Sequence, residues 1–474
     1  MSENKRGYIL FLSFVSAMGG LLFGYDWVVI GGAKPFYEEF LGIAGSTVLQ
    51  GWAMSCALVG CLAGAGVSGV LSDRYGRKYL LILSAVLFFL TSLGTGSASS
   101  FPVFVIFRML GGTAIGLASN LSPMYIAEVS PAKDRGKYVS INQLTVVIGI
   151  LAAQCVNWLI AEPVPIGASH SDILSSWNGQ TGWRWMFWAT CVPAALFFLL
   201  MWLVPESPRW LARKQGNRER VRSILARIGG ADYAETEVAA IERSLSRETG
   251  TSNIRALLAP GIRNMIIVGV VIAAFQQWCG INVIFNYAQE VFSAAGYGVS
   301  AILLNIVITG SVNLLFTFAG MSMVDRVGRR GLMLFGAGGL AAIYAVIGTL
   351  YALQLHGLPL LIMVVVAIAV YAMSLAPLTW VVISEIFPNR VRGGAMSVAT
   401  FSLWSASFLL IYTFPTLNES LHASGTFWLY GIICLLGFWF IYRKLPETKG
   451  KSLEQIEIEF ASGGVQLQKE RSTT

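Results

Sequence analysis

Long apolar runs, separated by short polar turns, recur along the whole chain. Each run has about 20 residues, which at the 1.5 Å rise of an α-helix is enough to cross the hydrocarbon core of a bilayer. The pattern predicts an all-α membrane protein in which twelve helices span the bilayer. The predicted helices lie at residues 8–32, 49–71, 79–99, 101–129, 138–161, 183–204, 263–293, 299–324, 331–354, 359–387, 394–416 and 424–443.

Composition and charge agree with this prediction. The 474 residues are 55% hydrophobic and 12% charged, with a mean hydropathy of +0.65, which is too apolar for a soluble enzyme of this size. Among the 33 Lys and Arg residues, Lys34 and Arg184 are assigned to outer segments and Arg108 to a helix interior, so the positive-inside rule places both termini in the cytoplasm. This bias and anionic lipid account for the net charge of +8, and no nucleic-acid partner is expected.

Cysteine and histidine positions argue against a metal, a cofactor or a catalytic centre. The six Cys fall in apolar runs without the spacing of metal ligands, and the three His lie in or beside outer loops. The sequence therefore favours a membrane protein that is not an enzyme and needs no cofactor.

The chain contains an internal duplication. Three motifs occur twice in the same order, each at equivalent predicted helices, which indicates two six-helix halves. We assign the halves to residues 1–204 and 261–446, with a cytoplasmic helical linker at 205–260 and a cytoplasmic tail at 447–474. Duplicated halves around a midplane site are typical of alternating-access transporters. The paired motifs are Asp73-Arg-Tyr-Gly-Arg-Lys78 with Asp325-Arg-Val-Gly-Arg-Arg330, Glu128-Val-Ser-Pro-Ala-Lys-Asp-Arg135 with Glu385-Ile-Phe-Pro-Asn-Arg-Val-Arg392, and Pro205-Glu-Ser-Pro-Arg-Trp210 with Pro446-Glu-Thr-Lys-Gly450.

Acidic and basic residues of these motifs gather at the cytoplasmic ends of the predicted helices. Opposite charges at one end of both halves can hold the halves together in one state of a transport cycle and separate in the other. The alternative, an ordinary excess of cytoplasmic bases, explains the bases but not the acids paired with them. The predicted cytoplasmic gate consists of Asp73, Arg74, Arg77, Glu128, Arg135, Glu206, Arg209, Asp325, Arg329, Arg330, Glu385 and Arg392.

A cluster of side-chain amides in the seventh apolar run predicts a binding site. Gln276 and Gln277 lie about 20 Å along their helix, close to the bilayer midplane. Buried amides are unfavourable unless they bind a partner or line a wet cavity, and they donate and accept hydrogen bonds as sugar hydroxyls do. We expect an uncharged ligand rich in hydroxyls, with Trp278, Phe285 and Tyr287 over its C–H faces. The further amides of this site are Asn282, Asn286 and, on the next predicted helix, Asn313.

The tenth run contains a proline that is expected to break its helix. Pro377 cannot donate a backbone hydrogen bond, so the segment around it can bend and act as a gate. Kinking without gating is the alternative, and the two are compatible. Tyr371 and Trp380 on this run, and Trp404 on the eleventh, are predicted to face the same cavity as the amides.

One acidic residue lies within the first apolar run. A carboxylate in hydrocarbon costs roughly 2.5–3.5 kcal/mol on insertion scales, so Asp26 requires a partner or a proton. Counting helix rise places Arg108 of the fourth run at a compatible depth, and we predict an ion pair between them that couples transport to protons. A purely structural pair is the alternative, although intramembrane ionisable residues usually mark ion pathways.

Two further patterns predict local packing. Gly60 and Gly64 on the second run, and Gly112 and Gly116 on the fourth, have the four-residue spacing that allows helices to pack closely. Between the halves, residues 209–255 combine charged and apolar positions with helical periodicity, which predicts short amphipathic helices beneath the bundle.

These motifs resemble those of a known family. The Asp-Arg-x-Gly-Arg-Lys motif at Asp73 is typical of the major facilitator superfamily, and the Pro-Glu-Ser-Pro-Arg-Trp, Pro-Glu-Thr-Lys-Gly and Gln-Gln-x-x-Gly-Ile-Asn motifs resemble those of its sugar porter family. The resemblance runs from about Tyr8 to Phe460 and implies the twelve-helix major facilitator fold and sugar transport. It places Phe23 and Gln143 among the sugar contacts, although an interhelical hydrogen bond is an equally good interpretation of Gln143.

The resemblance also bears on the proton and on the sugar. Proton-coupled members of the family carry an acid at the position of Asp26, whereas facilitative members typically do not. Leu403 stands where many relatives have Asn or Gln, and Asn286 stands where they commonly have the first of two tyrosines. Trp27 is a bulky neighbour of Asp26 and Ala376 replaces a frequent glycine, so both pentoses and hexoses remain open as substrates.

The sequence predicts a monosaccharide–proton symporter that imports a sugar such as xylose or glucose and works as a monomer in the inner membrane. Its expected partners are the monosaccharide, the proton and the lipid bilayer. A facilitative uniporter is the nearer alternative, and Asp26 argues against it. A non-transporting sugar sensor is the more distant alternative. Only about thirty residues follow the last predicted helix, which leaves little room for a signalling tail.

Overall fold

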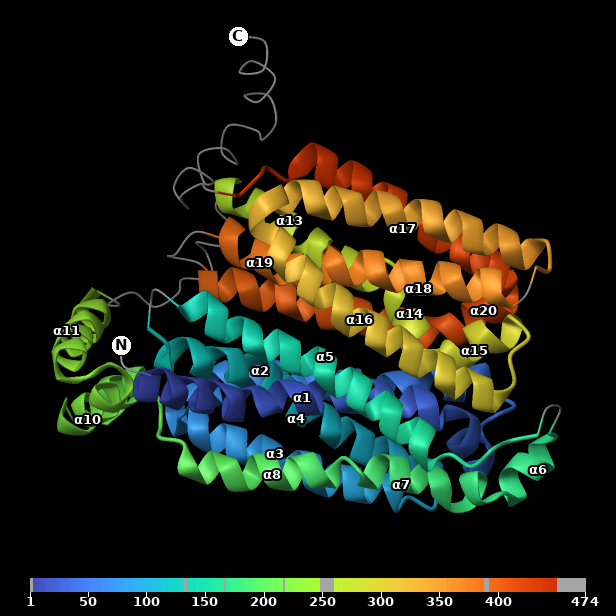
Figure 1. Cartoon of the computed structure of the whole chain (residues 1–474), viewed down its shortest axis with the longest axis horizontal. Helices are drawn as coiled ribbons and strands as arrows, with labels where there is room; N and C mark the ends of the chain where they lie inside the picture. Colours follow the sequence, from blue (N-terminus) through green and yellow to red (C-terminus); the bar gives the residue numbers. More distant parts are fainter. Residues whose placement is uncertain are drawn as a thin grey trace, which may run out of the picture. The chain divides into compact units, whose positions relative to one another are not determined.

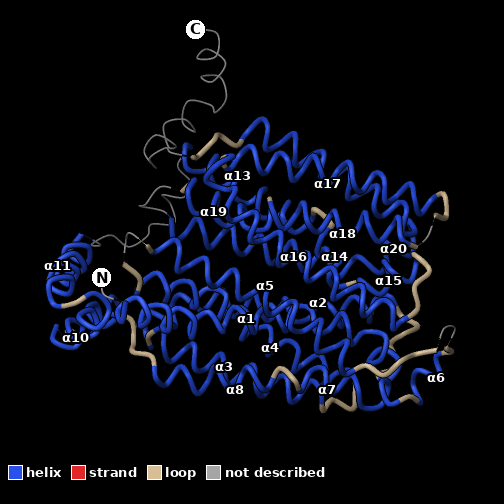
Figure 2. Tube along the Cα trace, viewed as in Figure 1, coloured by secondary structure: helices blue, strands red, loops and turns tan. Residues whose placement is uncertain are grey.

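The computed structural model describes residues 3–131, 134–165, 168–215, 218–247, 260–355, 357–387 and 392–449. Within these ranges every regular element is a helix (Figure 1, Figure 2). The helices are α1 Glu3–Phe40, α2 Thr47–Tyr75, α3 Arg77–Gly96, α4 Phe101–Val129, α5 Arg135–Ile160, α6 His170–Ser175, the π-helix η1 Asn178–Gly182, α7 Trp183–Trp188, α8 Cys191–Leu203, α9 Pro208–Gln215, α10 Arg218–Gly229, α11 Ala231–Arg247, α13 Pro260–Trp278, α14 Ile281–Asn286, α15 Ala288–Ala294, α16 Val299–Val327, α17 Arg329–Ala352, α18 Leu358–Met373, α19 Leu375–Ile386 and α20 Arg392–Lys444.

The chain divides into two compact units. In the first unit α3 packs against α4, α7 and α8, and in the second α17 packs against α18 and α20 while α13 packs against α20 (Figure 1). Helix α1 contributes to both units, because its residues up to Ala33 belong to the first and those from Lys34 onward belong to the second. The first unit comprises Met1–Ala33, Cys56–Ile160 and Trp177–Thr251, and the second comprises Lys34–Ser55, Ala161–Ser176 and Ser252–Thr474.

The predicted number of membrane crossings is confirmed. Eleven helices in the described part of the chain are long and apolar enough to cross a membrane. The last of these spans has 51 residues and would be about 76 Å long if straight, more than twice the roughly 30 Å hydrocarbon core. Its backbone is not helical at His422, where φ is 55° and ψ is 174°, so α20 consists of two helices joined at a bend. The described part of the chain therefore holds twelve segments that are long and apolar enough to cross a membrane.

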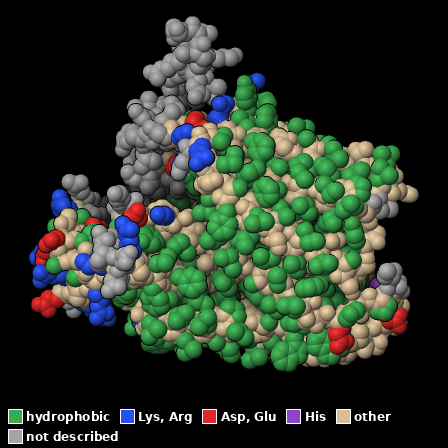
Figure 3. Space-filling model, in the orientation of Figure 1, with side chains coloured by type: hydrophobic (Ala, Val, Ile, Leu, Met, Phe, Trp, Pro, Cys, Tyr) green, Lys and Arg blue, Asp and Glu red, His purple; other side chains and the backbone are tan. Residues whose placement is uncertain are grey.

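The surface has the character expected of a protein in lipid. Hydrophobic side chains cover most of the surface of the transmembrane helices visible in Figure 3, and many of the Lys, Arg, Asp and Glu side chains in this view lie over α10 and α11. Large apolar side chains such as those of Leu199, Leu203 and Val192 are more than half exposed. In water such a surface would be an aggregation liability, and in a bilayer it faces the acyl chains.

Glycines bring α2 and α4 into backbone contact, as their spacing predicts. A Cβ atom added to Gly60 would collide with the carbonyl oxygen of Met109, and one added to Gly112 would collide with that of Ala57. The two helices approach closely enough that only hydrogen fits at these positions.

Two predicted helices are broken, one of them unexpectedly. The seventh run, predicted as continuous, forms α13, α14 and α15, because Gly280 adopts the left-handed conformation with φ of 87° and Tyr287 leaves the helical region. The tenth run breaks at Ser374, between α18 and α19. Pro377 cannot donate to the carbonyl of Met373, four residues earlier, so this break has the physical cause that the sequence predicts.

The predicted amphipathic linker is helical over its described residues. Helix α10 buries four apolar side chains, and α11 packs against it. Ion pairs join the two helices, with 2.6 Å between Arg222 Nε and Glu235 Oε1 and 3.5 Å between Arg218 Nε and Glu242 Oε1. These contacts define a helical pair, and its predicted position beneath the bundle stays a prediction.

Candidate functional site

Four of the predicted amides form a continuous hydrogen-bonded chain in the second unit. Gln276 Nε2 donates to Tyr371 Oη, and Gln277 Nε2 donates to Gln276 Oε1 at 2.6 Å. Asn282 Nδ2 donates to Gln277 Oε1 at 2.6 Å, and Asn286 Nδ2 donates to the backbone carbonyl of Asn282 at 2.9 Å. All five side chains are buried. We call these five residues the amide chain.

The break at Gly280 is what lets these amides meet. Residues five apart on a continuous helix point about 140° away from each other, so Gln277 and Asn282 would not face one another. The left-handed turn at Gly280 redirects the backbone between α13 and α14 and brings the two side chains together. A Cβ atom at Gly280 would also press against the ring of Tyr430. Glycine adopts this left-handed conformation without steric strain, so its presence at position 280 allows the turn that brings the polar side chains together.

Three other predicted contacts lie on neighbouring helices of the same unit. Asn313 on α16 and Trp404 on α20 are buried, and Trp380 on α19 is 37% exposed. Leu403, which precedes Trp404, is buried as well. The roles of Asn313, Trp380 and Trp404 in ligand binding stay predictions.

Two aromatic residues expected to cover a ligand also bind backbone carbonyls of α20, and their role over a ligand stays a prediction. Trp278 Nε1 donates to the carbonyl of Ala406 at 2.8 Å, and the indole lines an apolar cavity of about 720 Å³ between α13 and α20. Tyr287 is fully buried, its hydroxyl donates to the carbonyl of Ile411 at 2.6 Å, and its ring lies 4.4 Å from that of Phe414. Both residues hold helices together.

The predicted ion pair in the first unit is confirmed. Arg108 Nη1 on α4 donates to Asp26 Oδ2 on α1 at 2.8 Å, and the two residues are 3% and 5% exposed. The guanidinium also lies 5.8 Å from the ring centre of Phe187. Burial of either charge alone would be strongly unfavourable, so the pair offsets the desolvation of both.

The remaining predicted contacts of the first unit lie beside this pair in sequence or on α5. Phe23, one turn before Asp26 on α1, packs its ring edge-on against Trp27 at 6.0 Å. Gln143 is half-buried on α5, whose backbone contacts α1 closely at Gly24. Their roles as sugar contacts stay predictions.

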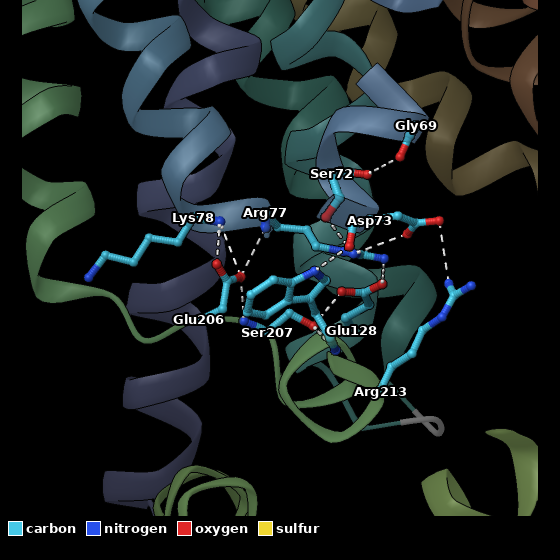
Figure 4. Close-up of polar contacts among 10 residues, drawn as sticks. Gly69, Ser72, Asp73, Arg77, Lys78, Glu128, Glu206, Ser207 and Arg213 are labelled. Carbon is cyan, nitrogen blue, oxygen red and sulfur yellow. Dashed lines mark hydrogen bonds and ion pairs between the residues drawn. The ribbon is translucent and has the colours of Figure 1, made fainter. Parts of the chain in front are cut away.

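Charged residues at one end of the first unit form a connected network, the first charge cluster (Figure 4). Arg77 Nη2 donates to Glu128 Oε1 at 3.0 Å, and Arg77 Nη1 lies 3.4 Å from Asp73 Oδ1. Glu206 Oε1 accepts the backbone N–H groups of Arg77 at 3.0 Å and Lys78 at 3.2 Å, the first two residues of α3. The Glu206 carboxylate therefore caps the N-terminus of α3, where the helix dipole favours negative charge.

Two opposing effects act on the pKa of the Glu206 carboxyl group. Burial raises the pKa of its carboxyl, while the N–H groups of Arg77, Lys78 and Ser207 favour the charged form and act against that shift. The neighbouring hydroxyl of Ser207 donates to Glu128, which joins the capping carboxylate to the Arg77 ion pair.

The second unit repeats this network at the duplicated motifs, in a second charge cluster. Arg329 Nη2 donates to Glu385 Oε1 at 3.1 Å. Glu447 accepts the backbone N–H groups of Arg329 at 2.9 Å and Arg330 at 3.0 Å, the first residues of α17. Thr448 Oγ1 donates to Glu385 Oε2 at 2.6 Å, as Ser207 does to Glu128. The ion pairs of each cluster described here join helices within one unit.

Ser207, Glu447 and Thr448 are members of the clusters that were not predicted from the sequence. The repetition of Pro-Glu-Ser as Pro-Glu-Thr could have identified them, because a motif that recurs after the last helix of each half indicates a repeated contact. Among the other residues of the predicted gate, Arg74 lies over the ring of Tyr75 at 5.2 Å. Arg135 and Arg209 are exposed. The side chains of Asp325 and Arg392 lie outside the described residues.

The first helix is longer than predicted. Its predicted end is residue 32, but α1 continues through Pro35 to Phe40, so Lys34, which was assigned to an outer segment, lies within a helix and is 3% exposed. Its Nζ lies 3.1 Å from Glu38 Oε1 and also forms an ion pair with Glu290 of α15. The spacing of Lys34 and Glu38, one helical turn apart, could have indicated that the helix continues past residue 32.

Comparison with known proteins agrees with this arrangement. The sequence model of the family described as "Sugar (and other) transporter" matches residues 12–460. The D-xylose-proton symporter of Escherichia coli strain K12 is 37% identical over 96% of both chains, and the arabinose-proton symporter of Bacillus subtilis is 36% identical over 96% of both. The glucose facilitated diffusion protein of Zymomonas mobilis is 34% identical over 96% of this chain and 98% of its own.

Solved structures share the fold. An inward-open structure of the xylose transporter XylE from E. coli superposes with a TM-score of 0.82, at 36% identity over 95% of this chain and 99% of that one. The same symporter bound to 6-bromo-6-deoxy-D-glucose, a major facilitator superfamily structure, gives a TM-score of 0.80 at 37% identity, over 96% of this chain and 100% of that one. The predicted major facilitator fold is confirmed, and the family is one of transporters and not of enzymes. The chain belongs to the sugar transporter family of the major facilitator superfamily.

Proposed function

We propose that this protein is a proton-coupled monosaccharide symporter that imports a pentose or hexose across the inner membrane by alternating access. The observation that carries the proposal is the buried Asp26–Arg108 pair, in a chain that also holds the amide chain. A carboxylate that binds a proton and amides that bind hydroxyls are the two chemical requirements of sugar–proton symport. The names of the two symporter relatives support this assignment.

In the proposed binding site, sugar hydroxyls exchange hydrogen bonds with Gln276, Gln277 and Asn282. Each amide of the chain has both a donor and an acceptor, so it can turn from its neighbour to a ligand without leaving a buried polar group unpaired. Gln143, Phe23, Asn286, Asn313, Tyr371, Trp380 and Trp404 complete the proposed set of sugar contacts.

The proton is proposed to bind to Asp26. When the carboxylate is charged, Arg108 holds it by the 2.8 Å ion pair. Protonation cancels the charge of Asp26 and weakens that pair, which changes how strongly α1 is held to α4. If sugar binding and protonation favour the same closed state, each increases the affinity for the other and the proton gradient drives uptake.

The two charge clusters are proposed to form the cytoplasmic gate. Both units carry Arg–Glu pairs at the duplicated motifs, and alternating access requires contacts that exist in one state and part in the other. We further propose that the halves are residues 1–204 and 261–446, with the linker 205–260 and the tail 447–474, that both termini are cytoplasmic, and that the monomer is functional.

A facilitative uniporter is the second candidate, because a relative of similar identity is named as a glucose facilitated diffusion protein. One experiment separates the two. Purified protein in proteoliposomes is given a panel of pentoses and hexoses, with and without an imposed pH gradient. Accumulation of a sugar above its outside concentration, only when the outside is acidic, supports the symporter. Equilibration without accumulation under both conditions supports the uniporter, and no sugar movement refutes both.

A further inference from the structure

An ion cluster on α1 and α15 lies outside the sugar, proton and gate residues described above; Lys34 and Glu38 in it are buried and Glu290 is half-buried. Lys34 Nζ lies 3.1 Å from Glu38 Oε1 and Oε2 and forms an ion pair with Glu290. The ammonium also lies 5.7 Å from the ring centre of Tyr287. These contacts compensate a charge that would be strongly unfavourable if buried alone. We call Lys34, Glu38 and Glu290 the Lys34 cluster.

The two carboxylates of the Lys34 cluster differ in what they connect. Lys34 and Glu38 are one turn apart, so their contact lies within α1. Glu290 lies on α15, and four residues before it stands Asn286, which ends α14 and belongs to the amide chain. The Lys34–Glu290 pair therefore attaches the segment that carries the amides to α1.

That segment depends on side-chain contacts for its position. The backbone leaves the helical conformation at Gly280 and again at Tyr287, so α14 is a six-residue helix without a continuous hydrogen-bonded ladder on either side. Such a short helix is not stable by itself and is held by what it packs against. The Lys34–Glu290 pair lies four residues beyond Asn286, on α15, and so restrains the end of α14 through the short connection at Tyr287.

We propose that Lys34 is a positioning residue for transport, which through Glu290 holds α14 and α15 in the arrangement where Asn282 and Asn286 bind sugar. This inference rests on the proposed function. Lys34 does not touch the sugar. It lowers the cost of ordering the binding segment, and a preordered site binds more tightly than one that is ordered on binding.

The cluster offers a matched pair of variants that tests this role. Glu290→Met and Glu38→Met each remove one carboxylate, each leave Lys34 with one remaining partner, and each keep a side chain of similar length. Only Glu290→Met removes the link to α15. In sugar–sugar exchange across proteoliposomes, we expect Glu290→Met to raise KM about tenfold with a smaller change in maximal rate, and Glu38→Met to leave KM within about twofold.

A charge exchange provides the rescue. The double variant Lys34→Glu, Glu290→Lys keeps one ammonium and two carboxylates at the cluster, and we expect its KM to return to within about threefold of the wild type. Equal KM values for the two Met variants overturn the inference. The inference is also overturned if the double variant unfolds at the same temperature as the wild type but its KM stays raised. If the double variant does not fold, the comparison of Glu290→Met with Glu38→Met is the test. Failure of the proposed sugar transport is seen separately, because the wild type would then exchange no sugar. Loss of proton coupling alone does not affect this test, because a uniporter also exchanges sugar.

Discussion

Replacing Asp26 by Asn removes the carboxylate that we propose as the proton carrier and keeps the size of the side chain. In the structure Asp26 Oδ2 accepts a hydrogen bond from Arg108 Nη1 at 2.8 Å, and the amide oxygen of the variant can still accept it. The change keeps this contact but removes the charge that compensates the buried guanidinium of Arg108, so we expect it to destabilise the protein by about 3–5 kcal/mol. We expect a folded protein with a lower unfolding temperature.

The effect on transport follows from the number of protons involved. One carboxylate binds one proton, and a pH difference of one unit is worth about 1.4 kcal/mol per proton. A wild-type symporter with this single carrier should accumulate sugar up to about tenfold for each unit by which the outside is more acidic. Asp26→Asn resembles the permanently protonated state and cannot release a proton inside, so its accumulation ratio should fall to about one.

Two uptake assays in proteoliposomes check this reasoning. Sugar–sugar exchange, which needs no net proton movement, should persist in Asp26→Asn, while accumulation driven by external acid should disappear. Asp26→Glu is the control, because it keeps a titratable carboxyl at the same position and should retain part of the driven uptake. If Asp26→Asn vesicles still concentrate sugar under an acidic outside, another group carries the proton and the assignment is wrong.

Three further predictions concern binding, selectivity and packing. Gln277→Ala interrupts the amide chain and should weaken sugar binding by about 1–3 kcal/mol in calorimetry, whereas unchanged affinity in folded protein would remove α13 from the site. The double change Leu403→Asn, Asn286→Tyr should alter the ratio of pentose to hexose uptake, and an unaltered substrate profile would show that these positions do not set selectivity. Gly112→Ala places a methyl group against the carbonyl of the facing helix and should destabilise the protein by about 1–3 kcal/mol in thermal unfolding, while the control Gly66→Ala, which has open space, should have little effect.

Features that depend on composition or local spacing could be predicted from the sequence. The twelve apolar runs, the close packing at Gly60 and Gly112, and the break caused by Pro377 each follow from the chemistry of the residues concerned. The Asp26–Arg108 pair could also be predicted, because two opposite charges in apolar runs have few other ways to be compensated.

Features that depend on contacts between residues far apart in the sequence could not be predicted. The burial of Lys34 is one such feature, because its partner Glu290 lies 256 residues later in the sequence. The break at Gly280 could not be recognised either, since a lone glycine is common inside membrane helices and its left-handed conformation is selected by the packing around it. The hydrogen bonds of Trp278 and Tyr287 could not be predicted for a similar reason, because the carbonyls that they bind belong to α20.

The closed hydrogen bonding of the amide chain has a consequence for how long a ligand stays bound. At the proposed sugar site, a sugar replaces hydrogen bonds that the amides make to one another, so it gains only the difference between the bonds it makes and the bonds it displaces. We expect such an exchange to give modest affinity and a short residence time, because the amides recover their own partners as the sugar leaves.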